Sequence, residues 1–304
     1  MDTVGSFLAE AVVTLEEAEF DEPRRRVRAL IASALNLSLS ELLIDPERPL
    51  DQLEAARLLG LVNRMARGEP LSRVLGRREF WGLDFTLSDE TLDPRPESET
   101  IVETVLARII NRDYPLRLLD LGTGTGCLLL ALLSELPSAI GYGVDISQDA
   151  VATARRNAEA LGLAPRAQFC VGNWGGPLAP RFDVIVANPP YIATAMVAKL
   201  PREVKDYDPA QALDGGEDGL AQYRMLAAYL PALLAPFAIF VGEMGEGQAD
   251  TVVSILRRCG LILEAIERDF AGRERCIVMR GTAPGQAERF VEAQKNLGMR
   301  CSHV

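Results

Sequence analysis

The stretch LRLLDLGTGTGC, residues 116–127, decides the fold of this chain. Its first half is apolar and ends on Asp120, which is typical of a buried strand. Glycines then recur at every second position, and glycine permits a tight turn whose backbone comes close to a ligand. The residues from Cys127 onward predict a helix directly behind the turn. The order of strand, glycine turn and helix therefore predicts a nucleotide-binding α/β domain.

The segments on the C-terminal side of the glycine turn alternate between strand and helix lengths. Further strands are expected at 140–145, 167–171, 182–187 and 237–244. Two more, 260–269 and 274–281, are close enough for a hairpin, so one of them runs antiparallel. We therefore expect an α/β fold with a doubly wound, mostly parallel, seven-stranded sheet of the Rossmann-like type.

The segments on the N-terminal side differ in pattern. Residues 5–67 carry apolar residues at helical spacing, which predicts a small helical bundle. Asp51 and Glu54 match a capping box at the start of one of its helices, and Gly68 closes that helix. Residues 79–93 predict a β-hairpin around Ser88–Glu90, and a helix is expected from Ser98 to Asn111. The bundle is either a structural cap on the next domain or a partner-recognition domain.

Composition excludes several kinds of chemistry. His303 is the single histidine and the five cysteines form no CxxC pair, which argues against a metal site and against Ser-His-Asp or Cys-His catalysis. A formal net charge of -11 argues against tight, sequence-independent binding to nucleic acid. No apolar run approaches the roughly 20 residues of a membrane span, and the acidic N-terminus is unlike a signal peptide. We therefore expect a cytoplasmic protein that uses no metal and binds no membrane.

The acidic residues around the glycine turn indicate which cofactor it holds. Asp145 ends the next strand, about 20 residues after the last glycine, where a carboxylate accepts ribose hydroxyls. Asp120 precedes the glycines and suits a cationic group such as a methionine amine. This D-x-G-x-G-x-G pattern resembles the class I S-adenosylmethionine methyltransferases. A nicotinamide cofactor, or glycines that only form a turn, are the less favoured alternatives.

The stretch VIVANPPYIA, residues 184–193, indicates the chemistry. The strand ends on Asn188, and two prolines prevent its regular continuation. The Asn188 side-chain oxygen and the Pro189 carbonyl are neutral acceptors that suit a planar NH2 group, either the amine of adenine or the amide of glutamine. Orienting such a nitrogen at the cofactor's methyl group needs no strong base, because methylation makes the nitrogen very acidic. Pro190 and Tyr191 could stack on the planar group.

Together these motifs resemble the release factor glutamine methyltransferases (PrmC/HemK family), up to about residue 281. The matching segments are EPLSRVLGRREFWGLDF (69–85), DPRPESE (93–99), DLGTGTGC (120–127), GVDIS (143–147), FDVIVANPPYI (182–192), YDPAQALDGGEDGLAQYR (207–224), GEMGEGQAD (242–250) and DFAGRERCIV (269–278). The resemblance implies N5-methylation of the glutamine in the Gly-Gly-Gln motif of class 1 peptide chain release factors, with S-adenosyl-L-methionine converted to S-adenosyl-L-homocysteine. The alternatives are a ribosomal-protein glutamine methyltransferase and an N6-adenine nucleic acid methyltransferase.

The resemblance also implies the roles of individual residues. Asn188 and Pro189 are the expected catalytic residues, and substrate contacts are expected along Asn188, Pro189, Pro190 and Tyr191. The helical N-terminal domain is expected to contact the release factor. Cofactor contacts are expected from Gly122, Thr123, Gly124, Thr125, Gly126, Asp145, Trp174 and Asn188.

The domain organisation follows from these patterns along the chain, and the recognition role of its first domain is what the resemblance implies. We expect a helical substrate-recognition domain over residues 1–78, a β-hairpin linker over 79–97, a methyltransferase domain over 98–281 and a tail over 282–304 that forms a short helix or is disordered.

Several positions depart from the family pattern or have open roles. Asn173 stands where an acid commonly precedes the tryptophan, and residues 235–238 lack the usual glycines. Arg95, Glu97 and Glu99 form a substrate-pocket wall, a domain-linking ion pair or only a solvated helix start. Glu243 either lines the pocket or makes a buried structural hydrogen bond.

Overall fold

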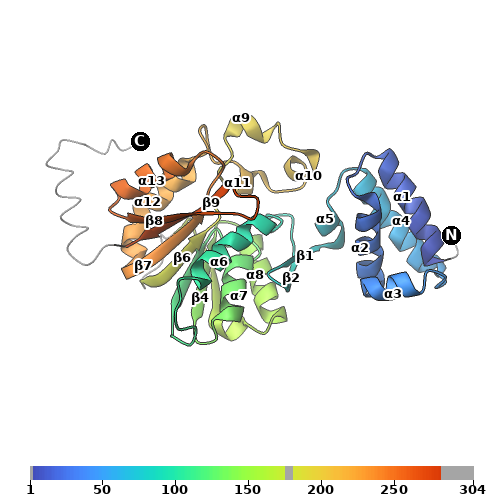
Figure 1. The fold of residues 1–304 in the computed structure, drawn as a ribbon, viewed down its shortest axis with the longest axis horizontal. Coiled ribbons are helices and arrows are strands. Elements are labelled where there is room, and N and C mark those ends of the chain that lie inside the picture. The colour runs from blue at the N-terminus through green and yellow to red at the C-terminus, as the bar shows by residue number, and fades with distance from the viewer. Residues whose placement is uncertain (1–2, 175–180, 282–304) are drawn as a thin grey trace. The chain divides into compact units, whose positions relative to one another are not determined.

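The computed structural model describes residues 3–174 and 181–281 and divides the chain into two compact units (Figure 1). The first unit contains residues 3–77 together with Pro201–Tyr207. The second contains Arg78–Leu200 and the described residues from Asp208 onward. The tail predicted over 282–304 lies outside the described residues. No helix in the described ranges is both long and apolar enough to cross a membrane.

The first unit is a helical bundle, as the spacing of its apolar residues predicts. Phe7, Leu30 and Leu58 lie in its core. Glu54 N donates to Asp51 Oδ1 at 2.7 Å and Asp51 N donates to Glu54 Oε2 at 3.2 Å, which confirms the predicted capping box. The helices are α1 (Val4–Glu17), α2 (Pro23–Leu35), α3 (Leu39–Ile44), α4 (Gln52–Ala66), α5 (Leu71–Leu75) and α10 (Arg202–Lys205).

The second unit is built on a seven-stranded sheet, which confirms the predicted fold. Its strand order is β5-β4-β3-β6-β7-β9-β8. Pairing is parallel throughout except for β9, which runs antiparallel to both of its neighbours. The strands are β3 (Arg117–Leu121), β4 (Ile140–Asp145), β5 (Ala167–Val171), β6 (Phe182–Ala187), β7 (Leu234–Glu243), β8 (Ile262–Arg268) and β9 (Glu274–Arg280).

Helices cover both faces of this sheet (Figure 1), so its central strands are apolar on both sides. Val184 and Val186 of β6 lie in one hydrophobic cluster, whereas Ile185 and Ala187 lie in the other, because successive strand side chains point to opposite faces. One cluster includes α6 (Glu99–Leu106), α7 (Cys127–Glu135) and α8 (Gln148–Ala160), and the other includes α12 (Ala221–Leu233) and α13 (Ala249–Arg258). Short helices complete the unit: η1 (Pro96–Ser98), η2 (Ala164–Arg166), α9 (Thr194–Val197) and α11 (Ala210–Leu213).

The predicted hairpin is present, but its turn was placed wrongly. Strands β1 (Arg77–Phe80) and β2 (Leu83–Thr86) are joined by Trp81 and Gly82, not by Ser88–Glu90. Trp81 and Gly82 have φ of 56° and 68°, and a two-residue turn with both values positive matches the right-handed twist of paired strands. A tryptophan with positive φ is uncommon, so local sequence did not favour this turn. The helix expected from Ser98 to Asn111 is also shorter, because α6 ends at Leu106.

The segment without the usual glycines is irregular. Phe237 has φ of 64°, which belongs to the left-handed region that glycine adopts without strain. The register between β6 and β7 shifts between Phe182 and Val184, opposite this segment. The segment that departs from the family pattern therefore forms a bulge near the start of β7. Glu243 lies at the opposite end of this strand.

Candidate active site

A cavity of about 270 Å³ lies in the second unit, at the end of β3 and of the strands on either side of it. It is lined by residues that follow the carboxyl ends of β3, β4 and β6. Strand β3 pairs with β4 on one side and with β6 on the other, so the chain reverses its order across the sheet at β3. Such a switch point is where open α/β sheets bind their ligands.

The glycine turn after β3 forms one wall of the cavity. Gly122, Gly124 and Gly126 all have positive φ, at 76°, 53° and 82°. The amides of Gly122 and Thr123 donate to Val144 O at 2.9 and 3.0 Å, which ties the turn to the end of β4. Gly122 lies under the Trp174 ring, because a Cβ there would lie 3.6 Å from Trp174 Cζ3.

One of the predicted cofactor residues, Gly126, does not line the cavity. Gly126 is the N-cap residue of α7 and packs against Ala154 and Leu130, since a Cβ there would lie 3.2 Å from a side-chain atom of each. It shapes the turn without lining the cavity. The predicted residues that do line it are Gly122, Thr123, Gly124, Thr125, Asp145, Trp174 and Asn188.

Asp145 is held in place by backbone donors at the end of β4. Gly124 N donates to Oδ2 at 2.8 Å and Ser147 N donates to Oδ1 at 2.9 Å. Burial raises the pKa of Asp145, while these backbone hydrogen bonds oppose the rise. A carboxylate oxygen has a second lone pair, so both oxygens can still accept a hydroxyl from a ligand in the cavity.

Asp120 has a different position from the one its sequence context suggests. Its side chain is fully buried, does not line the cavity and accepts a hydrogen bond from Thr123 Oγ1 at 2.7 Å. Within the described residues, Asp120 Oδ1 has no hydrogen-bond partner. Burial raises the pKa of Asp120 to about 7. The carboxyl group therefore supports the turn through Thr123 rather than opening onto a ligand.

The Asn-Pro-Pro-Tyr segment follows β6 and forms the opposite wall. Asn188 and Pro190 line the cavity, whereas Pro189 and Tyr191 are not among the residues that line it. Asn188 Nδ2 donates to Ser98 Oγ at 2.9 Å, and its Oδ1 accepts no hydrogen bond from any described residue. The Pro189 carbonyl oxygen likewise has no donor in the described ranges. Two neutral acceptors are thus left available at the end of β6.

Ser98 is the residue that the sequence interpretation missed. It lies in the quoted DPRPESE segment, two residues after Pro96 of the Pro-Arg-Pro turn, and no role was assigned to it. Ser98 is buried, lines the cavity and donates to Glu243 Oε2 at 2.5 Å. Tyr191 OH donates to the other carboxylate oxygen, Glu243 Oε1, at 3.0 Å. Glu243 does not line the cavity, so the alternative of buried hydrogen bonds is the one the structure supports.

The charged residues around the Pro-Arg-Pro turn have separate positions. Arg95 lines the cavity and pairs with Asp208 of the same unit, which contradicts the alternative of a domain-linking ion pair. Glu99 Oε1 accepts the Trp81 amide at 2.9 Å and so holds the hairpin turn. Glu97 is exposed, as expected for a solvated helix start.

Other nucleophiles and metal ligands are not assembled here. Burial raises the pKa of the Cys127 thiol, next to the cavity, to about 12, so this thiol stays protonated at neutral pH. Among residues 3–174 and 181–281, no group of three or more His, Cys, Asp or Glu residues is arranged to hold a metal ion.

Comparison with known proteins is consistent with both units. A family model for the PrmC N-terminal domain matches residues 6–76, and one for a methyltransferase domain matches residues 113–215. The release factor glutamine methyltransferase of Rhodospirillum rubrum is 47% identical over 93% of this chain and 86% of its own length. The release factor glutamine methyltransferase of Agrobacterium fabrum is 43% identical over 91% of this chain and 97% of its own length.

The chain belongs to the release factor glutamine methyltransferase family. This confirms the resemblance inferred from the motifs. A solved methyltransferase from Pyrococcus furiosus covers 77% of this chain and 100% of its own length, with 16% identity and a TM-score of 0.50. That likeness concerns the fold alone and agrees with the sheet described above.

Proposed function

We propose that this protein transfers the methyl group of S-adenosyl-L-methionine to the side-chain amide nitrogen, N5, of the glutamine in the Gly-Gly-Gln motif of class 1 peptide chain release factors. The observation that carries the proposal is the orientation of Asn188. Because its Nδ2 is committed to Ser98, its Oδ1 is the atom left to meet a ligand in the cavity. An acceptor at this point suits an NH2 group.

The residues of the cavity fit the proposed cofactor. Asp145 keeps a lone pair on each oxygen for two ribose hydroxyls, and the Trp174 ring beside Gly122 offers a flat surface for adenine. The turn from Gly122 to Gly126 allows close approach of the backbone. S-adenosyl-L-methionine supplies an electrophilic methyl group, and S-adenosyl-L-homocysteine is the product.

The acceptors at the end of β6 would orient the glutamine amide. Asn188 Oδ1 and the Pro189 carbonyl accept one amide hydrogen each, which draws electron density toward the nitrogen and aims its lone pair at the methyl group. An amide nitrogen is a poor nucleophile, so this orientation and polarisation provide most of the rate enhancement. Pro190 and Tyr191 would flank the planar amide.

Transfer of the methyl group needs no protein base. The methylated nitrogen is strongly acidic and gives its proton to water. Burial, and secondarily the charge of Glu243, raise the pKa of Tyr191, so its phenol stays protonated at neutral pH and does not act as the base. This is compatible with a sequence whose single histidine is His303.

We further propose that the helical unit formed by residues 3–77 recognises the release factor. Release factors work at the ribosome, so we place the reaction in the cytoplasm. The proposed substrate is the release factor protein, without stable binding of nucleic acid.

The test uses labelled S-adenosyl-L-methionine with a class 1 release factor or with the same factor carrying Gln→Ala in its Gly-Gly-Gln motif. We expect label in the unchanged factor only. Equal labelling of both factors would exclude this glutamine as the target. Parallel reactions with ribosomal protein and with bare RNA or DNA separate the two alternatives. Activity on nucleic acid that falls steeply with salt would favour the adenine methyltransferase.

A further inference from the structure

A buried carboxylate stands behind the candidate active site and holds two of its walls. Glu243 is the last residue of β7 and is only 1% exposed. Its Oε2 accepts the Ser98 hydroxyl at 2.5 Å and its Oε1 accepts the Tyr191 hydroxyl at 3.0 Å. Ser98 belongs to the segment before α6, and Tyr191 follows β6. One side chain thus joins two segments that are distant in sequence.

Both side-chain oxygens of Glu243 act as acceptors, because the Ser98 and Tyr191 hydroxyls each donate to one of them. Burial raises the pKa of Glu243, whereas these two hydrogen bonds lower it and so favour the ionised carboxylate, which can only accept. The single hydroxyl hydrogen of Ser98 is directed to Glu243, which leaves Ser98 Oγ as an acceptor toward Asn188. Asn188 must therefore present its NH2 group to Ser98, at 2.9 Å, and its oxygen to the cavity.

The opposite orientation of Asn188 would defeat its proposed role. The terminal torsion of asparagine is broad and roughly two-fold, so the side chain alone does not choose between the two orientations. A flipped amide would place Oδ1 against the lone pairs of Ser98 Oγ and turn an NH2 group toward the substrate's own NH2 group. Acceptor polarity at Asn188 is thus set by its neighbours.

We propose that Glu243 is a positioning residue, which acts through Ser98 to keep the Asn188 side-chain oxygen turned toward the cavity. Glu243 also holds the Tyr191 side chain of the same Asn-Pro-Pro-Tyr segment in place. The inference rests on the proposed function and assigns to it two residues, Ser98 and Glu243. Neither is a catalytic residue, because Glu243 does not line the cavity and Ser98 directs its hydrogen bonds to Glu243 and Asn188.

The central variant is Glu243→Gln, which keeps the shape but removes the acceptor-only character. A carboxamide can donate to Ser98, which then donates to Asn188 and favours the flipped amide. We expect kcat to fall by about tenfold or more. Complete loss of one transition-state hydrogen bond typically lowers kcat by about 10² to 10³, and a misdirected bond should cost part of that factor. KM for the release factor and Kd for the cofactor should stay within about twofold.

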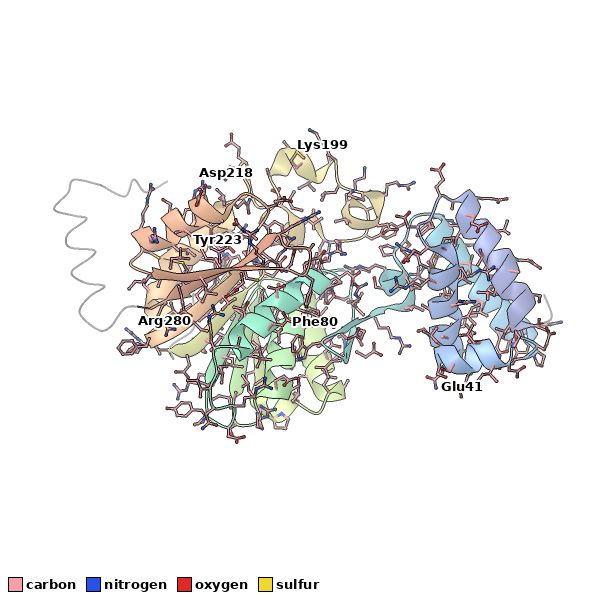
Figure 2. The ribbon with its side chains drawn as sticks, in the orientation of Figure 1. Glu41, Phe80, Lys199, Asp218, Tyr223 and Arg280 are labelled. Atoms are coloured by element: carbon pink, nitrogen blue, oxygen red, sulfur yellow. The ribbon has the colours of Figure 1, made fainter. Side chains whose placement is uncertain are left out.

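A matched control is Tyr223→Phe. Tyr223 lies in α12 and is labelled in Figure 2. Its hydroxyl donates to the backbone oxygen of Glu243, not to the carboxylate. Its removal disturbs the same strand end while leaving the carboxylate contacts intact, so kcat should stay within about twofold of the unchanged protein. An equal loss of kcat in Tyr223→Phe and Glu243→Gln would mean that Glu243 acts only as a structural residue.

A mutant cycle tests the route of the effect. Ser98→Ala and Tyr191→Phe remove the two hydroxyls that contact the carboxylate. In the Ser98→Ala/Tyr191→Phe background, adding Glu243→Gln should change kcat by less than about twofold, because both routes are gone. A full additional loss in that background would overturn the proposal, as would an unchanged kcat in the single Glu243→Gln variant.

A measurement without release factor separates this inference from the proposed function. The side-chain NH2 signals of Asn188, identified by their loss in Asn188→Ser, are followed by NMR hydrogen exchange. We expect faster exchange in Glu243→Gln and in Ser98→Ala than in the unchanged protein and in Tyr223→Phe. Equal exchange rates in all four proteins would overturn the positioning role of Glu243. If the rates differ as expected but the release factor is not methylated, only the substrate assignment is overturned.

Discussion

Asn188 Nδ2 lies 2.9 Å from Ser98 Oγ, although 90 residues separate the two in the sequence. This contact turns the Asn188 oxygen toward the cavity and makes the Asn-Pro-Pro-Tyr segment an acceptor for NH2 groups. The segment before α6 therefore takes part in the site through Ser98, a residue to which the sequence interpretation assigned no role.

The acceptor at Asn188 can be tested by removing it. In Asn188→Ala we expect the single-turnover rate of release factor methylation to fall by roughly 10² or more, as for loss of a transition-state contact. Cofactor affinity, measured by calorimetry, should remain mostly intact because Asp145 and the glycine turn are unchanged. An Asn188→Ala enzyme with the rate of the unchanged protein would contradict the acceptor role.

The ribose assignment depends on Asp145. Asp145→Ala removes both carboxylate oxygens and should weaken cofactor binding by about tenfold or more, because hydrogen bonds to a charged group contribute roughly 1.5–3 kcal/mol. Calorimetric titration with S-adenosyl-L-homocysteine measures the effect. Asp149→Ala, an acid in the first turn of α8, is the control and should bind as before. Identical affinities of the two variants would show that the ribose lies elsewhere.

The buried Asp120 makes the stability of the second unit depend on pH. Its pKa is raised from 3.8 to about 7, mainly by burial, so between these values the folded state keeps a proton that the unfolded state has lost. Stability then falls as pH rises through this window, because the folded state binds more protons. Asp120→Asn imitates the protonated form and removes this contribution.

Urea unfolding of both proteins at several pH values between about 4 and 7.5 measures the difference. The free energy of unfolding of the unchanged protein should fall relative to that of Asp120→Asn as pH rises. If the two curves run parallel, Asp120 does not hold a proton in the folded state.

Close packing behind the glycine turn leads to another prediction. A Cβ on Gly143 of β4 would lie 2.5 Å from Phe169 Cδ1 and 2.9 Å from Thr123 Oγ1. Gly143→Ala should therefore destabilise the protein by about 1–3 kcal/mol through overpacking. Gly60→Ala, inside α4 with no atom outside the adjoining helix backbone within 4 Å of the added Cβ, should stabilise it by up to about 1 kcal/mol. Scanning calorimetry compares the two, and a stabilised Gly143→Ala would show that β4 has room there.

The parts that could be predicted from sequence depend on local patterns. Strands β4, β5 and β6 have the predicted bounds because each is a short apolar run closed by a turn signal. The turn at Trp81 was missed because positive φ at tryptophan has no sequence signal. The role of Ser98 was missed because its partners, Asn188 and Glu243, come together only when α6 packs beside the sheet. Hydrogen-bond direction likewise depends on which groups meet, and this is a property of the folded chain.

The short segment Pro201–Tyr207 has a practical consequence for dissecting this enzyme. It belongs to the helical unit, where Arg26 Nη1 lies 3.5 Å from Glu203 Oε1, while the residues before and after it belong to the sheet unit. The polypeptide therefore passes from one unit to the other more than once. A truncated protein that starts at residue 78 would lack the helices against which this segment packs. For the same reason, a chimera with a relative that is joined only near residue 78 would combine this segment with a foreign helical unit.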